Sequence, residues 1–134
     1  MRLLTVITLL LLAYTNVEAS SCFVQEASDE ATKSYYDKAL TYMQENENDV
    51  EMVFSLPSVV DKDALQTITL VIVNEDNGSY ELVVPVAATS SDDKLSKVPL
   101  VLTKEVFEKA DLIINYGSCA LQYQLELQRG EAVR

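Results

Sequence analysis

The sequence predicts a mainly β fold, in which about six antiparallel strands form a sandwich or a single sheet and one N-terminal amphipathic helix packs on it. An α+β fold is the alternative. Residues 67–88 read TITLVIVNEDNGSYELVVPVAA, with β-branched runs on both sides of Asn77-Gly78, a pair typical of a hairpin turn. Further short apolar runs, separated by turn residues, recur up to the C-terminal end. Residues 28–45 instead show helical periodicity.

The predicted helix spans residues 28–45. Ser28 is a suitable N-cap, and Asp29 and Glu30 occupy the first turn, where the helix dipole favours acids. Apolar residues recur three and four positions apart on one face, namely Ala27, Ala31, Tyr35, Ala39, Leu40 and Met43. We expect this face to lie on the sheet and the polar run ENENDVE to end the helix.

The first predicted strand, residues 50–56, and the hairpin at 67–88 are joined by a loop at 57–66. The strand points Val50, Met52, Phe54 and Leu56 inward. In the hairpin, a two-residue turn at Asn77-Gly78 would pair Val73 with Leu82, Ile72 with Val83 and Val71 with Val84. Both faces of this ribbon are apolar, so we expect other elements to cover both.

The remaining predicted segments are a strand at 98–102, one or two helical turns at 103–110 capped by Thr103, and strands at 111–116 and 119–128. The last two strands alternate clearly. Their inward residues are Leu112, Ile114 and Tyr116 in the first, and Leu121, Tyr123, Leu125 and Leu127 in the second.

Two prolines mark candidate sheet edges. Pro85 interrupts the second hairpin strand, and Pro99 interrupts the strand at 98–102. Because proline has no amide hydrogen to donate to a neighbouring strand, it is confined to edges and bulges. Both positions are therefore candidate edges for a partner to pair with.

The closing segment, LTKEVFEKADLIINYGSCALQYQLEL, resembles the closing strands of immunoglobulin-like domains. The resemblance implies an immunoglobulin-like sandwich. The chain departs from that family because it contains no tryptophan and because Cys22 precedes the helix. The resemblance therefore implies no function.

The only cysteines, Cys22 and Cys119, are predicted to form a disulfide, as an even pair does in an exported chain. Alternating strand directions place the loops after Leu56, Ala88 and Tyr116 at one end of the sheet, together with Cys119. A helix antiparallel to the first strand starts at that same end, next to Cys22. The predicted topology and the predicted bond therefore agree.

Residues 1–19 have the zones of a secretory signal peptide, with Arg2, a short apolar run and small residues before a cleavage site at Ser20. The run is too short to span a bilayer. The alternative is a lipoprotein signal, in which Cys22 would be acylated. Cleavage leaves one domain, residues 20–134, with no further segment of membrane-spanning length. The predicted location is periplasmic or extracellular.

The formal net charge is −11, and the loss of Arg2 and Glu18 with the signal peptide leaves it unchanged. Nucleic acids and anionic membranes are disfavoured partners because both would be repelled. Cationic partners, divalent metal ions or simple solubility are compatible with this charge.

The composition also restricts catalysis. The chain has no histidine, which excludes histidine bases and most zinc or iron sites, and its three glycines are scattered, which excludes a phosphate-binding loop. A carboxylate mechanism alone remains compatible with the composition. We predict no enzyme activity, no catalytic residues and no cofactor.

Two candidate sites remain. Asp61, Asp63, Asp92 and Asp93 lie on loops at the same predicted end and form a hypothetical calcium site, although no EF-hand loop is present and solvated loop acids are the simpler interpretation. Asn77-Gly78-Ser79 matches the N-glycosylation sequon, which a eukaryotic host alone would use and which turn chemistry explains equally well.

Three functional hypotheses follow. The first is a non-catalytic exported module that binds an unidentified protein partner through a sheet edge or a loop end. The second is a lipid-anchored envelope accessory protein, attached through Cys22. The third is a small-ligand carrier with a cavity between helix and sheet, lined by Tyr35, Tyr42 and Phe54.

Overall fold

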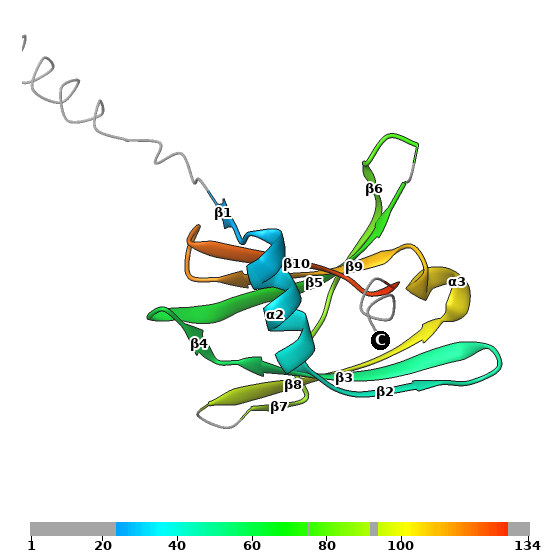
Figure 1. The fold of residues 1–134 in the computed structure, drawn as a ribbon, viewed down its shortest axis with the longest axis horizontal. Coiled ribbons are helices and arrows are strands. Elements are labelled where there is room, and N and C mark those ends of the chain that lie inside the picture. The colour runs from blue at the N-terminus through cyan, green and yellow to red at the C-terminus, as the bar shows by residue number, and fades with distance from the viewer. Residues whose placement is uncertain (1–23, 75, 92–93, 129–134) are drawn as a thin grey trace, which may run out of the picture.

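The computed structural model describes residues 24–74, 76–91 and 94–128, which form two β-sheets and an N-terminal helix (Figure 1). Sheet A has the strand order β1-β10-β9-β5, and both β4 and β6 pair with the remaining edge of β5. Sheet B has the order β2-β3-β8-β7. All of these pairs are antiparallel except β1 with β10. The predicted mainly β fold with one N-terminal helix is confirmed.

The elements have the following bounds. The strands of sheet A are β1 (Gln25–Glu26), β4 (Val59–Val60), β5 (Asp63–Val73), β6 (Tyr80–Pro85), β9 (Ala110–Tyr116) and β10 (Leu121–Glu126). The strands of sheet B are β2 (Leu40–Glu45), β3 (Asp49–Pro57), β7 (Ser90–Ser91) and β8 (Leu95–Thr103). The helices are α2 (Asp29–Ala39) and the single turn α3 (Lys104–Phe107).

One continuous core lies between the two sheets, so the sandwich and not the single sheet is correct. Sheet A contributes Ile68, Leu70, Leu112, Ile114, Tyr116, Tyr123 and Leu125. Sheet B contributes Val50, Met52, Phe54, Leu56, Val98, Leu100 and Leu102. The alternating inward positions predicted for β3, β9 and β10 are confirmed, because each strand presents one face to the core.

Helix α2 lies across one side of the sandwich and joins β1 of sheet A to β2 of sheet B (Figure 1). Its N-cap is Ser28, as predicted, and the Ser28 hydroxyl accepts from the Ala31 amide at 3.3 Å. Tyr35, Tyr36 and Ala39 are its buried residues. The Tyr36 hydroxyl donates to the Leu127 carbonyl at 3.1 Å, which ties the helix to the residue directly after β10.

The predicted end of the helix at residue 45 is wrong, because α2 stops at Ala39 and residues 40–45 form β2. Leu40 already has an extended backbone, with φ −71° and ψ 109°. The Thr41 hydroxyl donates to the Val53 carbonyl at 3.0 Å, and Asn46 donates from its backbone to Asp49. The run that was predicted to end a helix therefore closes a β2–β3 hairpin, whose pairing with β3 replaces helical hydrogen bonds.

The strand directions predict that the loops after Leu56, Ala88 and Tyr116 lie together at one end of the sandwich. Hydrogen bonds between these segments confirm this prediction. The Ser58 amide donates to the Lys94 carbonyl at 2.8 Å, and the Gly117 amide donates to the Ala64 carbonyl at 2.7 Å. The predicted loop at 57–66 is instead largely the β4–β5 hairpin. Asp61 and Lys62 form its two-residue turn, with φ of 47° and 79°.

The other predicted elements are found with small changes of boundary. α3 follows its predicted cap, since the Thr103 hydroxyl accepts from the Val106 amide at 3.4 Å. β8 is longer than predicted, and β7 pairs with it only at Ser96 and Lys97, so Pro99 has one neighbouring strand in the described chain. The short strands β1, β4 and β7 were not predicted, because two residues give no periodic pattern. Neither helix in the described residues is long and apolar enough to span a membrane.

Candidate functional site

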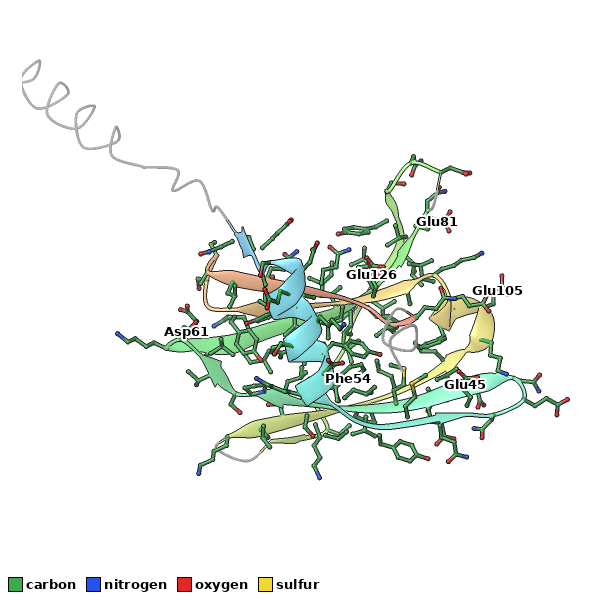
Figure 2. The ribbon with its side chains drawn as sticks, viewed as in Figure 1. Glu45, Phe54, Asp61, Glu81, Glu105 and Glu126 are labelled. Atoms are coloured by element: carbon green, nitrogen blue, oxygen red, sulfur yellow. The ribbon has the colours of Figure 1, made fainter. Side chains whose placement is uncertain are left out.

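Strand β6 is the candidate site, because it is an apolar edge strand exposed along its whole length. Tyr80, Leu82, Val83 and Val84 are exposed by 49%, 49%, 56% and 38%. Figure 1 shows the β5–β6 hairpin projecting from the body of the molecule, and Figure 2 places Glu81 on this projection, far from Phe54 between the sheets. The prediction that both faces of the hairpin are covered holds for β5 and is wrong for β6.

The projection begins where contact with the opposite sheet ends. Val86, just past β6, still packs against the core, and its amide donates to the Ile68 carbonyl at 2.8 Å. Leu82 and Val84 point to the same face of sheet A as Val86, since side chains two apart share a face. They nevertheless remain exposed. The apolar surface of β6 is therefore a continuation of the core face beyond the part that is covered.

The backbone of β6 leaves hydrogen-bonding groups on its outer side. Residues of an antiparallel pair alternate between those that bond to the partner strand and those that point away from it. Since the Val86 amide bonds to β5, the backbone N–H and C=O of Val84 also face β5. The backbone N–H and C=O of Val83 point outward. No strand of the described chain pairs with that side. Pro85 adds an outward carbonyl without an amide hydrogen.

The predicted register of this hairpin is wrong by one residue, and so is its two-residue turn. Val71 pairs with Val83 and Ile72 with Leu82, and a bulge then shifts Val73 opposite Tyr80. The loop is longer than predicted, because the Asn74 amide donates to the Ser79 carbonyl at 2.8 Å and Gly78 donates to Asn74 at 2.8 Å.

Only the glycine of the Asn77-Gly78 pair has a positive φ, +68°. The side chains of Asn74 and Asn77 each accept from the amide two residues on, at 2.9 Å, so asparagines hold a longer loop. Asn77 of the sequon is exposed at this tip, as predicted. Its use by a glycosylating host stays a prediction.

The candidate calcium ligands are only partly described. Asp92 and Asp93 lie outside the described residues. Asp61 is in the β4–β5 turn, and the Asp63 carboxylate lies against Gly117 of the β9–β10 turn. Among the described residues, no group of three or more acids or cysteines is placed to hold a metal ion. The calcium hypothesis therefore stays a prediction without a described ligand set.

Three tyrosines between α2 and sheet A form a close cluster. The rings of Tyr35 and Tyr123 stack with centroids 4.1 Å apart, and Tyr116 meets both edge-on. The Tyr35 and Tyr116 hydroxyl oxygens are 2.6 Å apart, and Tyr116 donates to the Pro57 carbonyl at 2.8 Å. Burial raises the pKa of Tyr116 to about 12 and moves that of Tyr35 further above its usual range. These side chains form core contacts.

The residues predicted to line a ligand cavity are not brought together. Tyr35 and Phe54 are buried in the core, and the Phe54 ring contacts Tyr36 edge-on at 5.8 Å. Tyr42 is exposed and lies opposite Val53, on the outer face of sheet B. Its hydroxyl bonds to Gln44 at 2.5 Å. The three side chains therefore do not share one surface.

The predicted disulfide falls partly outside the described residues, because Cys22 and the predicted signal peptide, residues 1–19, are not among them. Cys119 lies in the β9–β10 turn with a φ of 64°. Strand β1 begins three residues after Cys22 and pairs with β10 just after Cys119, since the Gln25 amide donates to the Ala120 carbonyl at 3.0 Å.

Comparison with known proteins gives no match to any family model, to any curated protein or to any solved structure. The resemblance to immunoglobulin-like domains stays a prediction. The sequence signals of the candidate site were Pro85 and the apolar alternation on both hairpin faces. Its exposure was not predicted, because the pattern does not show how far the opposite sheet extends.

Proposed function

We propose that this protein is an exported, non-catalytic module that binds a protein partner by strand addition to β6. The supporting observation is the outer side of β6, where backbone groups that pair with no strand of the described chain are flanked by exposed apolar side chains. Natural edge strands are usually short, charged or covered, because exposed edges associate with other chains. An uncovered apolar edge is therefore a candidate interface.

Strand addition would use both parts of this surface. An extended segment of the partner would exchange hydrogen bonds with the N–H and C=O of Val83 and donate to the Pro85 carbonyl. Its side chains would cover Leu82 and Val84 on one face and Val83 on the other. Backbone bonds would supply affinity, and the apolar contacts would supply preference for alternating apolar residues.

Export is part of the proposal and is supported by the predicted signal peptide. The pairing of β1 with β10 supports a Cys22–Cys119 disulfide, because it holds the chain next to both cysteines together. On the chain-entropy model, closing such a long loop stabilises the folded state by about 4 to 5 kcal/mol.

The intact mass of protein from its own host, reduced and unreduced, tests cleavage before Ser20, the disulfide bond, a glycan at Asn77 and acylation of Cys22. An acylated start would favour the lipid-anchored alternative.

Cross-linking in the native compartment tests the binding proposal itself. Val83→Pro removes an amide that points away from β5, so the intramolecular ladder keeps its bonds while the outer edge loses its central donor. A control, Val101→Lys, removes a 67% exposed apolar side chain from β8 in the other sheet.

We expect a partner that wild type and Val101→Lys capture and that Val83→Pro does not capture. Thermal unfolding of each variant checks that the fold is retained. Equal capture by Val83→Pro and wild type would exclude β6 as the binding site.

A further inference from the structure

All charged residues in the segment that contains β6 are negative. Between Lys62 and Lys94 all six charged residues are acids, namely Asp63, Glu75, Asp76, Glu81, Asp92 and Asp93. Within the described part of the projecting hairpin, Asp76 lies in the loop and Glu81 in the strand. Both are exposed. The charged residues that the described hairpin itself places beside its apolar edge are therefore acids.

Along sheet A, the base placed beside this hairpin by a backbone hydrogen bond is Lys109, which precedes β9 on the far side of β5. Its carbonyl accepts from the Val73 amide at 3.1 Å. Since β5 separates β9 from β6, the backbone of this lysine lies on the opposite side of β5 from the free edge. The Glu81 carboxylate accepts from the Asn74 side chain at 2.7 Å, a neutral donor that leaves its charge uncompensated.

This charge pattern also indicates which kind of chain would pair with the free edge of β6. Lysine is the residue that most often protects an exposed edge, and β6 has none. A second copy of the chain would bring two acidic hairpins together and would add to the repulsion between two molecules of net charge −11. A basic segment would instead be attracted.

We propose that the occupant of β6 is an extended segment of a partner protein in which alternating apolar residues are flanked by lysine or arginine. This inference rests on the proposed strand addition and specifies its partner. The apolar residues would cover Leu82, Val83 and Val84, and the flanking bases would lie near Glu81 and Asp76 at the rim. Rim charges act mainly on the association rate and on the choice of partner.

Synthetic peptides test this inference with the full chain. Three peptides share an alternating Thr-Val centre and differ only in their flanks, which are lysines, glutamines or glutamates. Fluorescence anisotropy measures their binding to wild type and to Val83→Pro, at low and at physiological salt. We expect the lysine-flanked peptide to bind about tenfold more tightly than the glutamine-flanked one at low salt, as two rim ion pairs, to Glu81 and Asp76, would give. This preference should shrink as salt screens the charges.

The outcomes separate the inference from the proposed function. If the glutamine and lysine peptides bind equally and both lose affinity for Val83→Pro, strand addition stands and the basic partner is excluded. If no peptide binds, or if Val83→Pro binds as wild type does, strand addition itself fails. Self-association of wild type that strengthens with salt would assign the edge to a second copy and overturn the inference.

Discussion

The Tyr35 hydroxyl donates its hydrogen to the Tyr116 hydroxyl. The two oxygens are 2.6 Å apart. Tyr35 must be the donor, because Tyr116 donates its single hydroxyl hydrogen to the Pro57 carbonyl. Tyr35 lies in α2, Tyr116 at the end of β9 and Pro57 at the end of β3. One chain of hydrogen bonds therefore links the helix, sheet A and sheet B.

The direction of this chain predicts unequal effects of removing its two hydroxyls. Tyr116→Phe leaves the Tyr35 hydroxyl without an acceptor and the Pro57 carbonyl without a donor, so we expect a loss of about 2 to 3 kcal/mol in the free energy of unfolding. Tyr35→Phe leaves the bond to Pro57 intact and should cost about 1 kcal/mol or less. Denaturant unfolding measures both. Equal losses would contradict the assigned direction.

The same pair predicts a loss of stability at alkaline pH. Burial raises the pKa of Tyr116 to about 12 and that of Tyr35 further, so the folded state holds protons that the unfolded state releases near pH 10. Stability is therefore complete below about pH 10 and falls above it, by about 1.4 kcal/mol per pH unit for each tyrosine. Chemical unfolding between about pH 9 and pH 11 measures the slope. If the free energy of unfolding of Tyr35→Phe fell with pH as steeply as that of wild type, Tyr35 would be excluded as a cause of the alkaline loss of stability.

Two neighbouring proline substitutions test the orientation of the β6 backbone. Val84→Pro removes an amide that faces β5 and should destabilise the protein by about 3 kcal/mol. Val83→Pro removes an outward amide and should cost less than about 1 kcal/mol. Thermal and denaturant unfolding compare the two. The reverse order would show that Val83 faces β5.

Two glycines with nearly equal φ predict different responses to alanine. Gly117, with φ +65°, leaves no room, because an added Cβ would lie 2.6 Å from the Asp63 Oδ1 atom and 2.9 Å from the Ala120 Cβ. Gly78, with φ +68°, has open space around it. We expect Gly78→Ala to cost about 1 kcal/mol from backbone strain alone and Gly117→Ala to cost more. Denaturant unfolding measures the difference, and equal costs would show that the Asp63 side chain moves freely aside.

Much of the fold could be predicted because the sandwich is built from clear alternation. β3 and β10 each bury one set of alternate residues more deeply than the other, and that pattern is visible in the sequence. β9 buries almost every residue, but its core-facing set was still predicted from the same alternation. The end of α2 could not be predicted, because Leu40 and Met43 continue the helical spacing while their pairing with β3 decides the outcome. Tertiary hydrogen bonds overrode a local pattern there.

The candidate site could be predicted only as an edge. Pro85 indicated an edge position, and β6 does have only one neighbouring strand, β5, in the described chain. The one-residue error in register arose at Asn77-Gly78, where two asparagine side chains support a longer loop and a bulge absorbs the extra residue. The apolar residues of β6 resemble those of β5, so only the structure distinguishes the covered strand from the exposed one.

The position of β10 inside sheet A has a consequence for the order of folding. This last strand lies between β1 and β9, and the helix bonds to the Leu127 carbonyl. During synthesis, β1 and α2 must therefore wait for β10 and Leu127 before they can make these contacts, whereas β10 can already pair with β9. Since such distant pairings slow folding, we expect the domain to acquire its native structure only after residues up to Leu127 are available to fold.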